Sequence, residues 1–279
     1  MSRLIVHADD FGISAGVNAG IVQAHRHGIL TSASLMVSGA AFDGAVSLLR
    51  ENPGLDAGVH LTLVGERPLL DPGRIPSLVD AGGRLPGAAP SFMRRYLAGR
   101  IDIEDVRREL DAQIGRAREC VPAVSHLDSH QHLHMLPAVW KITMQLARRH
   151  GIRAVRRPRE ALRASMLLRP AGYPRLAQQL VLNAFCAAAG RGSLREPDHF
   201  FGFYHGGRLG RDNLLVLLRS LPADGYCELM CHPGSDATDA AHDWGYRWRD
   251  ERDALTDEAV RRTVSERGIQ LVSYADLAR

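Results

Sequence analysis

The chain has 279 residues, of which 45% are hydrophobic and 24% are charged, and its formal net charge is +4. A chain of this length and composition buries a sizeable core, which excludes a disordered or fibrous protein. Its apolar runs fall short of the roughly 20 residues that a membrane-spanning helix needs. The apolar run after Arg3 stops at Asp9, too early for a signal-peptide core, so we expect a cytoplasmic protein.

The positive charge comes almost entirely from arginine, because Lys141 is the sole lysine among the 35 basic residues. These residues are spread along the chain among 31 acidic ones. Nucleic-acid-binding proteins gather basic residues on one face instead. The composition therefore argues against a nucleic-acid partner.

Short apolar runs alternate with helical patterns along the chain, which is typical of βα units around a parallel sheet or barrel. The apolar runs predict strands at residues 4–7, 33–37, 57–63, 124–128, 153–156, 226–231 and 270–273. The helical patterns predict helices at residues 16–27, 41–52, 103–119, 137–150, 209–221 and 257–267. No repeat of fixed period accompanies them, which argues against a solenoid.

Two regions interrupt this alternation within what we expect to be one domain, residues 1–279. Residues from about 65 to 98 are rich in Pro and Gly and predict an insertion or long loop. Residues from about 157 to 195 are rich in Ala, Leu and Arg and predict a helical insertion. Its apolar residues at helical spacing are Leu176, Leu180, Val181, Ala184 and Phe185. This helix either packs on the sheet or forms an amphipathic lid that touches a lipid or a membrane surface.

Two adjacent carboxylates, Asp9 and Asp10, directly follow the first predicted strand. Sites in βα folds form at the carboxyl ends of parallel strands. Buried carboxylates need a metal, a counter-charge or strong hydrogen bonds. The pair therefore indicates either a functional site or a cap for the next helix.

Histidines recur at the ends of later strands. His60 lies in the third predicted strand, and His232 follows a later strand within a Cys-His-Pro-Gly run. The fourth strand leads into five polar residues at alternating spacing, which strand geometry would direct toward one end of the sheet: His126, Asp128, His130, His132 and His134. Two imidazoles and one carboxylate from separate strands are a typical ligand set for a catalytic divalent ion.

A second carboxylate beside such a ligand can accept the proton of a water molecule that the ion acidifies. His232 could protonate a leaving group or stabilise an oxyanion. The ligand set suits Zn, Mn, Ni, Fe or Mg and does not identify the metal.

Four motifs together resemble the YdjC-like carbohydrate deacetylases. They are His7-Ala-Asp-Asp-Phe-Gly12, Gly58-Val-His-Leu61, the run from His126 to His134, and Cys231-His-Pro-Gly234. The resemblance implies a distorted (β/α) barrel, similar to a TIM barrel, that removes the acetyl group from N-acetylated amino sugars with one divalent metal ion. By position it implies Asp10, His60 and His130 as metal ligands, Asp9 as general base and His232 as acid or transition-state partner.

The roles of two neighbouring histidines stay open. His132 and His134 are expected to orient His130 or to contact sugar hydroxyls, although strand alternation also allows His132 to replace His130 as the ligand. The run from Ala24 to Val37 resembles the hopanoid-biosynthesis-associated (HpnK-type) branch, which implies an N-acetylglucosaminyl hopanoid lipid as substrate. The oligomeric state is not predicted.

Aromatic residues Trp244, Tyr246 and Trp248 follow His232 at alternating positions and either stack on a sugar ring or anchor their own loop. Three other functions are weighed against a deacetylase. A binuclear phosphoesterase needs more ligands on a later strand than His232 supplies. A glycosidase with Asp9 and Asp128 as its acid pair leaves the histidines without a role. A non-enzymatic sugar or metal sensor does not need Asp9.

Overall fold

Eight strands form one curled, parallel sheet in the computed structural model, which describes residues 2–167, 170–235, 242 and 244–279. The strands are β1 (Arg3–Phe11), β2 (Ser32–Leu35), β3 (Asp56–Leu61), β4 (His126–Ser129), β5 (Ala154–Val155), β6 (His199–Phe201), β7 (Tyr226–Cys231) and β8 (Gln270–Val272). Their order is β5-β4-β3-β2-β1-β7-β6, and β8 pairs with β1. Two isolated parallel bridges, Ala154–Arg195 and Glu160–Phe200, join the two edges. The predicted distorted, TIM-barrel-like α/β fold is confirmed.

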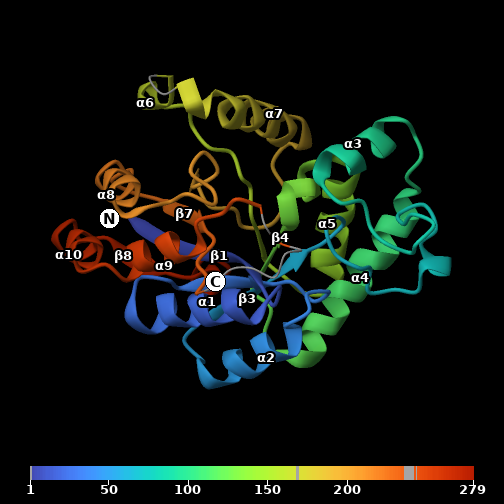
Figure 1. Cartoon of the computed structure of the whole chain (residues 1–279), viewed down its shortest axis with the longest axis horizontal. Coiled ribbons are helices and arrows are strands. Elements are labelled where there is room, and N and C mark those ends of the chain that lie inside the picture. Colours follow the sequence, from blue (N-terminus) through green and yellow to red (C-terminus); the bar gives the residue numbers. More distant parts are fainter. Residues whose placement is uncertain (1, 168–169, 236–241, 243) are drawn as a thin grey trace.

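Most of the helices lie on the outer side of this sheet (Figure 1). The α-helices are α1 (Ala15–His27), α2 (Phe42–Glu51), α3 (Ala89–Leu97), α4 (Ile103–Cys120), α5 (Pro137–Arg149), α6 (Ala164–Leu167), α7 (Tyr173–Ala189), α8 (Arg211–Arg219), α9 (Trp248–Thr256), α10 (Glu258–Glu266) and α11 (Tyr274–Leu277). By contrast with the outer helices, Tyr274 of α11 packs with Ile5 and His126 inside the barrel. Short 3₁₀ helices are η1 (Pro72–Arg74), η2 (His130–Met135) and η3 (Pro170–Gly172). Within the described residues no helix combines the length and apolarity needed to cross a membrane.

The first strand explains why polar groups enter the barrel. Successive side chains of a strand point to opposite faces. Leu4, Val6 and Ala8 belong to the large apolar cluster formed with the outer helices, whereas Ile5 packs with Tyr274 of α11 in a separate cluster. His7 and Asp9 follow Ile5 on that second side, so the strand directs an acid and an imidazole into the barrel.

Among the strands and α-helices, four short elements were not predicted: strand β6 and helices α3, α9 and α11. Strand β6 spans three residues and helix α11 spans four, which is too few to show a period. Helix α3 occupies the end of the Pro-rich insertion, and Pro90 is tolerated because it lies in the first helical turn, where a backbone N–H has no intrahelical partner.

The apolar residues that the spacing placed on one side of α7 do not all pack against the protein. The buried residues of this helix are Leu176, Gln179, Leu182 and Cys186. Leu180 and Val181 are 49% and 52% exposed. Apolar residues lie on more than one side of α7, so their spacing did not identify the side that packs.

The alternation expected from His126 to His134 stops early. Strand β4 ends at Ser129, and Gln131 and His132 in η2 take left-handed backbone angles, with φ of 52° and 56°. The histidines beyond Ser129 therefore do not alternate as they would in a strand. His126, at the start of β4, stacks on Tyr274 inside the barrel rather than at its carboxyl end.

Candidate active site

Asp10, His60 and His130 come together at the carboxyl ends of β1, β3 and β4. Asp10 Oδ1 lies 3.4 Å from His60 Nε2 and 3.0 Å from His130 Nδ1, and all three side chains are buried. Two ligands of one ion with bonds of about 2.1 Å lie about 3.0–3.4 Å apart in tetrahedral or octahedral geometry. The spacing of these three donor side chains therefore suits a single divalent ion.

Asp128 orients His60 from the side away from this donor group. Its Oδ1 lies 2.9 Å from His60 Nδ1, which leaves Nε2 facing Asp10. Burial opposes protonation of His60, but the carboxylates of Asp128 and Asp9 raise its pKa to about 10. Burial likewise opposes ionisation of Asp10, yet His130 and His60 hold the pKa of its carboxyl well below the usual range. The His60 shift reflects the carboxylates around that imidazole, and the Asp10 shift reflects the imidazoles around that carboxylate.

Asp9 points to a different partner, the fully buried Arg156. The two terminal nitrogens of Arg156 donate to the two oxygens of Asp9, at 2.8 and 2.7 Å. The same guanidinium lies 2.8 Å from Asp128 Oδ2 and donates through Nε to Glu228 Oε1 at 2.7 Å. Burial opposes the charge, but the three carboxylates raise the pKa of Arg156 well above its usual value. This network fixes the Asp9 carboxylate beside the donor group.

His232 reaches the site from the end of β7. Its Nε2 lies 3.9 Å from Asp9 Oδ2, and its Nδ1 lies 4.0 Å from Glu251 Oε2. Glu251 is itself held by the backbone N–H groups of His232 and Leu209, which donate to it at 2.6 and 2.9 Å. Burial raises the pKa of Glu251. The imidazole therefore lies between Asp9 and a second, anchored acid.

These groups open onto a pocket of about 700 Å³. Its polar lining consists of Asp9, Asp10, His130, Gln131, His132 and His232 together with Arg175 and Gln178 of α7. Most of the remaining wall is apolar and comes from both predicted insertions: Ala89, Pro90 and Met93 from α3, and Val181, Leu182 and Phe185 from α7. Leu133, Met135, Leu136, Phe203 and Met230 complete this apolar wall. The pocket thus combines these polar groups with a larger apolar wall, which we call the apolar chamber.

The other predicted contact residues divide into two groups. His132, Trp244 and Tyr246 line the pocket, and the Trp244 ring lies 5.1 Å from that of His130. His132 Nδ1 is buried without a hydrogen-bond partner among the described residues. His134 and Trp248 are not brought to the pocket wall. His134 is fully buried, with its ring nitrogens 2.5 Å from Ser129 Oγ and 3.0 Å from the Arg156 carbonyl, and Trp248 packs against Gly234.

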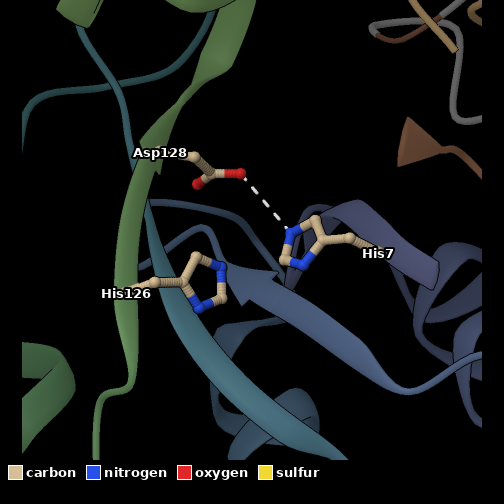
Figure 2. Close-up of side chains that lie close together, drawn as sticks. All are labelled: His7, His126 and Asp128. Atoms are coloured by element: carbon tan, nitrogen blue, oxygen red, sulfur yellow. Dashed lines mark ion pairs between the residues drawn. The ribbon is translucent and has the colours of Figure 1, made fainter. Parts of the chain in front are cut away.

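A further group of ligand-type side chains, His7, His126 and Asp128, lies inside the barrel (Figure 2). His7 Nε2 is 3.4 Å from Asp128 Oδ2, and the rings of His7 and His126 meet edge to face. The same Asp128 oxygen already binds Arg156 and accepts from Ser34 Oγ at 3.0 Å. We therefore regard this group as the support of Asp128 and, through it, of His60.

Arg156, Glu228 and Glu251 were not predicted as site residues. Glu228 stands alone in the otherwise uncharged run Cys-Glu-Leu-Met-Cys, and a lone charge within a buried strand could have drawn attention to it. Arg156 is one of four arginines within seven residues, and nothing in the local pattern separates the buried one from the rest.

Comparison with known proteins gives relatives along the whole chain. A protein of Geobacillus stearothermophilus named carbohydrate deacetylase is 33% identical over 274 residues, which are 98% of this chain and 96% of the relative. A protein of Serratia marcescens named chitooligosaccharide deacetylase is 31% identical over 278 residues, 98% of each chain. A solved structure from Enterococcus faecalis V583, described as a candidate cellobiose-phosphate cleavage protein, is similar with a TM-score of 0.79 and 27% identity. That similarity covers 100% of this chain and 99% of the other.

The family model of the YdjC-like proteins matches residues 3–266. This match spans all four sequence motifs and every side chain of the donor group and of the Arg156 network. The chain therefore belongs to the YdjC-like protein family.

Proposed function

We propose that this protein is a metal-dependent hydrolase that removes the N-acetyl group from an N-acetylglucosamine-type sugar. One observation carries the proposal: side chains suited to hold a metal meet a separate carboxylate, Asp9, and an imidazole, His232, beside one pocket. The names of the relatives, carbohydrate deacetylase and chitooligosaccharide deacetylase, agree with that chemistry. We further propose that residues 1–279 act as one deacetylase domain, because both insertions contribute to the pocket wall.

In the proposed mechanism the metal is held by Asp10, His60 and His130. This ligand set suits Zn, Mn, Ni or Mg. When bound, a divalent ion supplies Lewis acidity that polarises the acetamide carbonyl and makes water a better nucleophile. Asp9 takes up a proton from the attacking water, with its carboxylate held in place by Arg156. His232 donates a proton to the departing amine, so that the amide and water become acetate and a free amine.

The pocket explains how the substrate would be placed. The ring faces of Trp244 and Tyr246 suit stacking on a sugar, and the unpartnered Nδ1 of His132 suits a sugar hydroxyl. His134 orients the segment around His130 through its two hydrogen bonds rather than by touching the sugar.

The mechanism is tested with paired variants of the adjacent acids. We expect Asp9→Asn to lower kcat by about 10²–10⁴-fold, the usual contribution of a general base, while metal content is retained. Asp10→Asn should lower metal content as well as activity. The measurements are amine release from N-acetylglucosaminyl conjugates, with and without chelator, and the metal content of each purified variant. Loss of metal from Asp9→Asn alone would show that the two acids have exchanged roles.

We also propose that the sugar is carried by a hopanoid glycolipid and that the protein meets it at a membrane surface. The support is the resemblance of residues 24–37 to the hopanoid-associated branch and the apolar chamber beside the site. The alternative substrate is a soluble N-acetylated oligosaccharide. Lipids from a strain lacking the protein should accumulate the N-acetylglucosaminyl hopanoid in mass spectra. An unchanged lipid profile would reject the hopanoid substrate and leave the deacetylase proposal standing.

The competing hydrolase class is tested with the same protein. A phosphoesterase would release phosphate from an aryl phosphate and leave the acetamide intact. A sensor without turnover would bind the sugar and release neither product. These outcomes separate the three functions in one set of assays.

A further inference from the structure

Exposed hydrophobic side chains are concentrated on one part of the surface. Nine large hydrophobic side chains are exposed among the described residues, and five of them lie between residues 162 and 181. They are Leu162, Leu167, Tyr173, Leu180 and Val181, with exposed fractions of 48–59%. We call this surface the α6–α7 face. It lies on α6, on α7 and on the segment just before α6; the two helices are at the upper edge of the molecule in Figure 1.

The α6–α7 face carries almost no charge of its own. The exposed residues of α7 are tyrosine, proline, alanine, glutamine, leucine and valine. Arg175 is the sole charged residue of this 17-residue helix, and it is partly buried, donating to the Phe203 carbonyl at 2.9 Å. A helix on the surface of a globular protein normally presents charged residues to water. The composition of this helix therefore points to a partner less polar than water.

The chain around this face is strongly basic. Residues 157–195 contain seven arginines and a single acid, Glu160, which is a net charge of +6, while the whole chain has +4. Glu160 is fully buried, and Arg159, Arg191 and Arg195 are exposed on either side of α7. The rest of the protein is thus slightly acidic, and the positive charge gathers around the apolar face.

We propose that the α6–α7 face docks on the surface of an anionic lipid bilayer. Arg163 and Arg157 are paired with Glu160 and Glu196, but Arg159, Arg191 and Arg195 remain exposed around the apolar side chains. Exposed apolar side chains flanked by arginines are the combination that binds the interface of anionic membranes. A second copy of the chain is a poorer occupant, because a symmetric dimer through this face would oppose two segments of charge +6. We infer the lipid partner from the chemistry of this surface, and the inference does not depend on the reaction that the protein catalyses.

Docking in this way would bring the pocket mouth to the lipid. Val181, Leu182 and Phe185 of α7 line the apolar chamber, while Leu180 and Tyr173 of the same helix are exposed. One helix therefore connects the outer face to the chamber. This step rests on the proposed function: an apolar group attached to the sugar would pass from the bilayer into the chamber without crossing water.

Vesicle co-sedimentation of the full chain tests the docking. The vesicles are phosphatidylcholine alone and phosphatidylcholine with phosphatidylglycerol. We expect binding to the anionic vesicles that weakens at high salt, and weaker binding to neutral ones. The double variant Leu167→Gln/Leu180→Gln should bind the anionic vesicles about tenfold more weakly, because it removes two insertable side chains. Val216→Gln on α8, which replaces a residue that is 61% exposed, is the matched control and should bind like the wild type.

The outcomes separate this proposal from the proposed function. The docking proposal would be overturned if both variants bound vesicles equally or if the wild type did not bind. It would also be overturned by a dimer in solution that Leu167→Gln/Leu180→Gln dissociates. Amine release from a soluble N-acetylglucosaminide should be the same in the wild type and the double variant. If no conjugate is deacetylated while vesicle binding follows the expected pattern, the catalytic proposal fails and the docking stands.

Discussion

Histidine takes opposite protonation states within one site, according to its neighbours. Carboxylates beside His60 raise its pKa to about 10, whereas burial lowers the pKa of His134 to about 4. Burial likewise lowers the pKa of His126 and His132 well below the usual value. In the metal-free protein the same residue type is therefore a cation beside carboxylates at His60 and a neutral hydrogen-bonding group at His134, and His60 would have to lose its proton to bind a metal.

The neutral state of His134 predicts a loss of stability in mild acid. Its pKa falls from the usual 6.5 to about 4 on folding. Below pH 6.5 this imidazole binds a proton in the unfolded chain but not in the folded chain. The free energy of unfolding therefore falls as the pH falls from about 6.5 towards 4. For this group the loss at pH 5 is about 2 kcal/mol. Urea unfolding of the metal-depleted protein between pH 7 and pH 5 measures it.

The control for this prediction is His134→Asn, which retains a donor and an acceptor but does not titrate. It should lower stability at pH 7 and reduce its dependence on pH between 7 and 5. A pH dependence identical to that of the wild type would contradict the assignment to His134.

Residues at strand ends were the predictable part of the site. Asp9, Asp10 and His60 follow or end apolar runs, and a parallel fold collects such positions at one edge. Arg156 was not predictable, because its burial depends on three carboxylates contributed by β1, β4 and β7. A counter-charge of this kind is a property of the assembled barrel and leaves no local pattern in the sequence.

At the scale of elements, a close approach between α1 and the turn after β7 positions His232. A Cβ atom added to Gly20 would lie 2.3 Å from the Gly234 Cα. The turn is tied to α1 by Ser235, whose backbone N–H donates to the Gly16 carbonyl at 2.9 Å, and to α9 by Gly234, which donates to the Trp248 carbonyl at 3.0 Å. Glycine at position 20 is therefore required by packing rather than by backbone conformation.

We expect Gly20→Ala to be destabilising despite the higher helix propensity of alanine. The overlap with backbone atoms should cost about 1–3 kcal/mol and displace the turn that carries His232, lowering kcat. Gly115→Ala in α4 is the matched control, since an added Cβ there meets nothing within 4 Å. It should stabilise the protein by about 0.5–1 kcal/mol. Equal effects of the two substitutions on thermal unfolding would refute the close approach.

The six helices predicted from a periodic apolar pattern, α1, α2, α4, α5, α8 and α10, begin and end within two residues of the prediction. The three-residue strand β6 is too short to show a period. The left-handed backbone of η2 was not predicted, because this conformation is usually adopted by glycine and here it occurs at Gln131 and His132.

At the scale of the whole molecule, the barrel interior holds more acidic than basic groups. Asp9, Asp10, Asp128 and Glu228 are each no more than 3% exposed, and the cations beside them are the fully buried Arg156 and, in the metal-free protein, His60, whose pKa the carboxylates raise to about 10. Uncompensated buried charge is strongly destabilising. A divalent ion at the donor group would therefore stabilise the fold as well as serve the reaction.

We accordingly expect the thermal midpoint to fall on chelation and to rise again with added divalent metal. At a free metal concentration of about 100 times Kd the gain should be about 2.7 kcal/mol. Asp10→Asn, which removes one ligand, should show a much smaller response. Differential scanning calorimetry with a titration of each metal measures the effect and ranks Zn, Mn, Ni and Mg. A midpoint independent of metal in the wild type would count against the predicted ligand set.

The pairing of β1 has a consequence for how the chain folds during synthesis. Its neighbours are β2 and β8 on one side and β7 on the other, and β7 begins at Tyr226. At about 5–20 residues per second a ribosome needs about 10–40 s to pass from the end of β1 to the start of β7. For that time the apolar strand carrying Asp9 and Asp10 lacks its longest partner. The emerging polypeptide must be shielded from aggregation until nearly all of it has been made, and its catalytic centre is among the last parts to assemble.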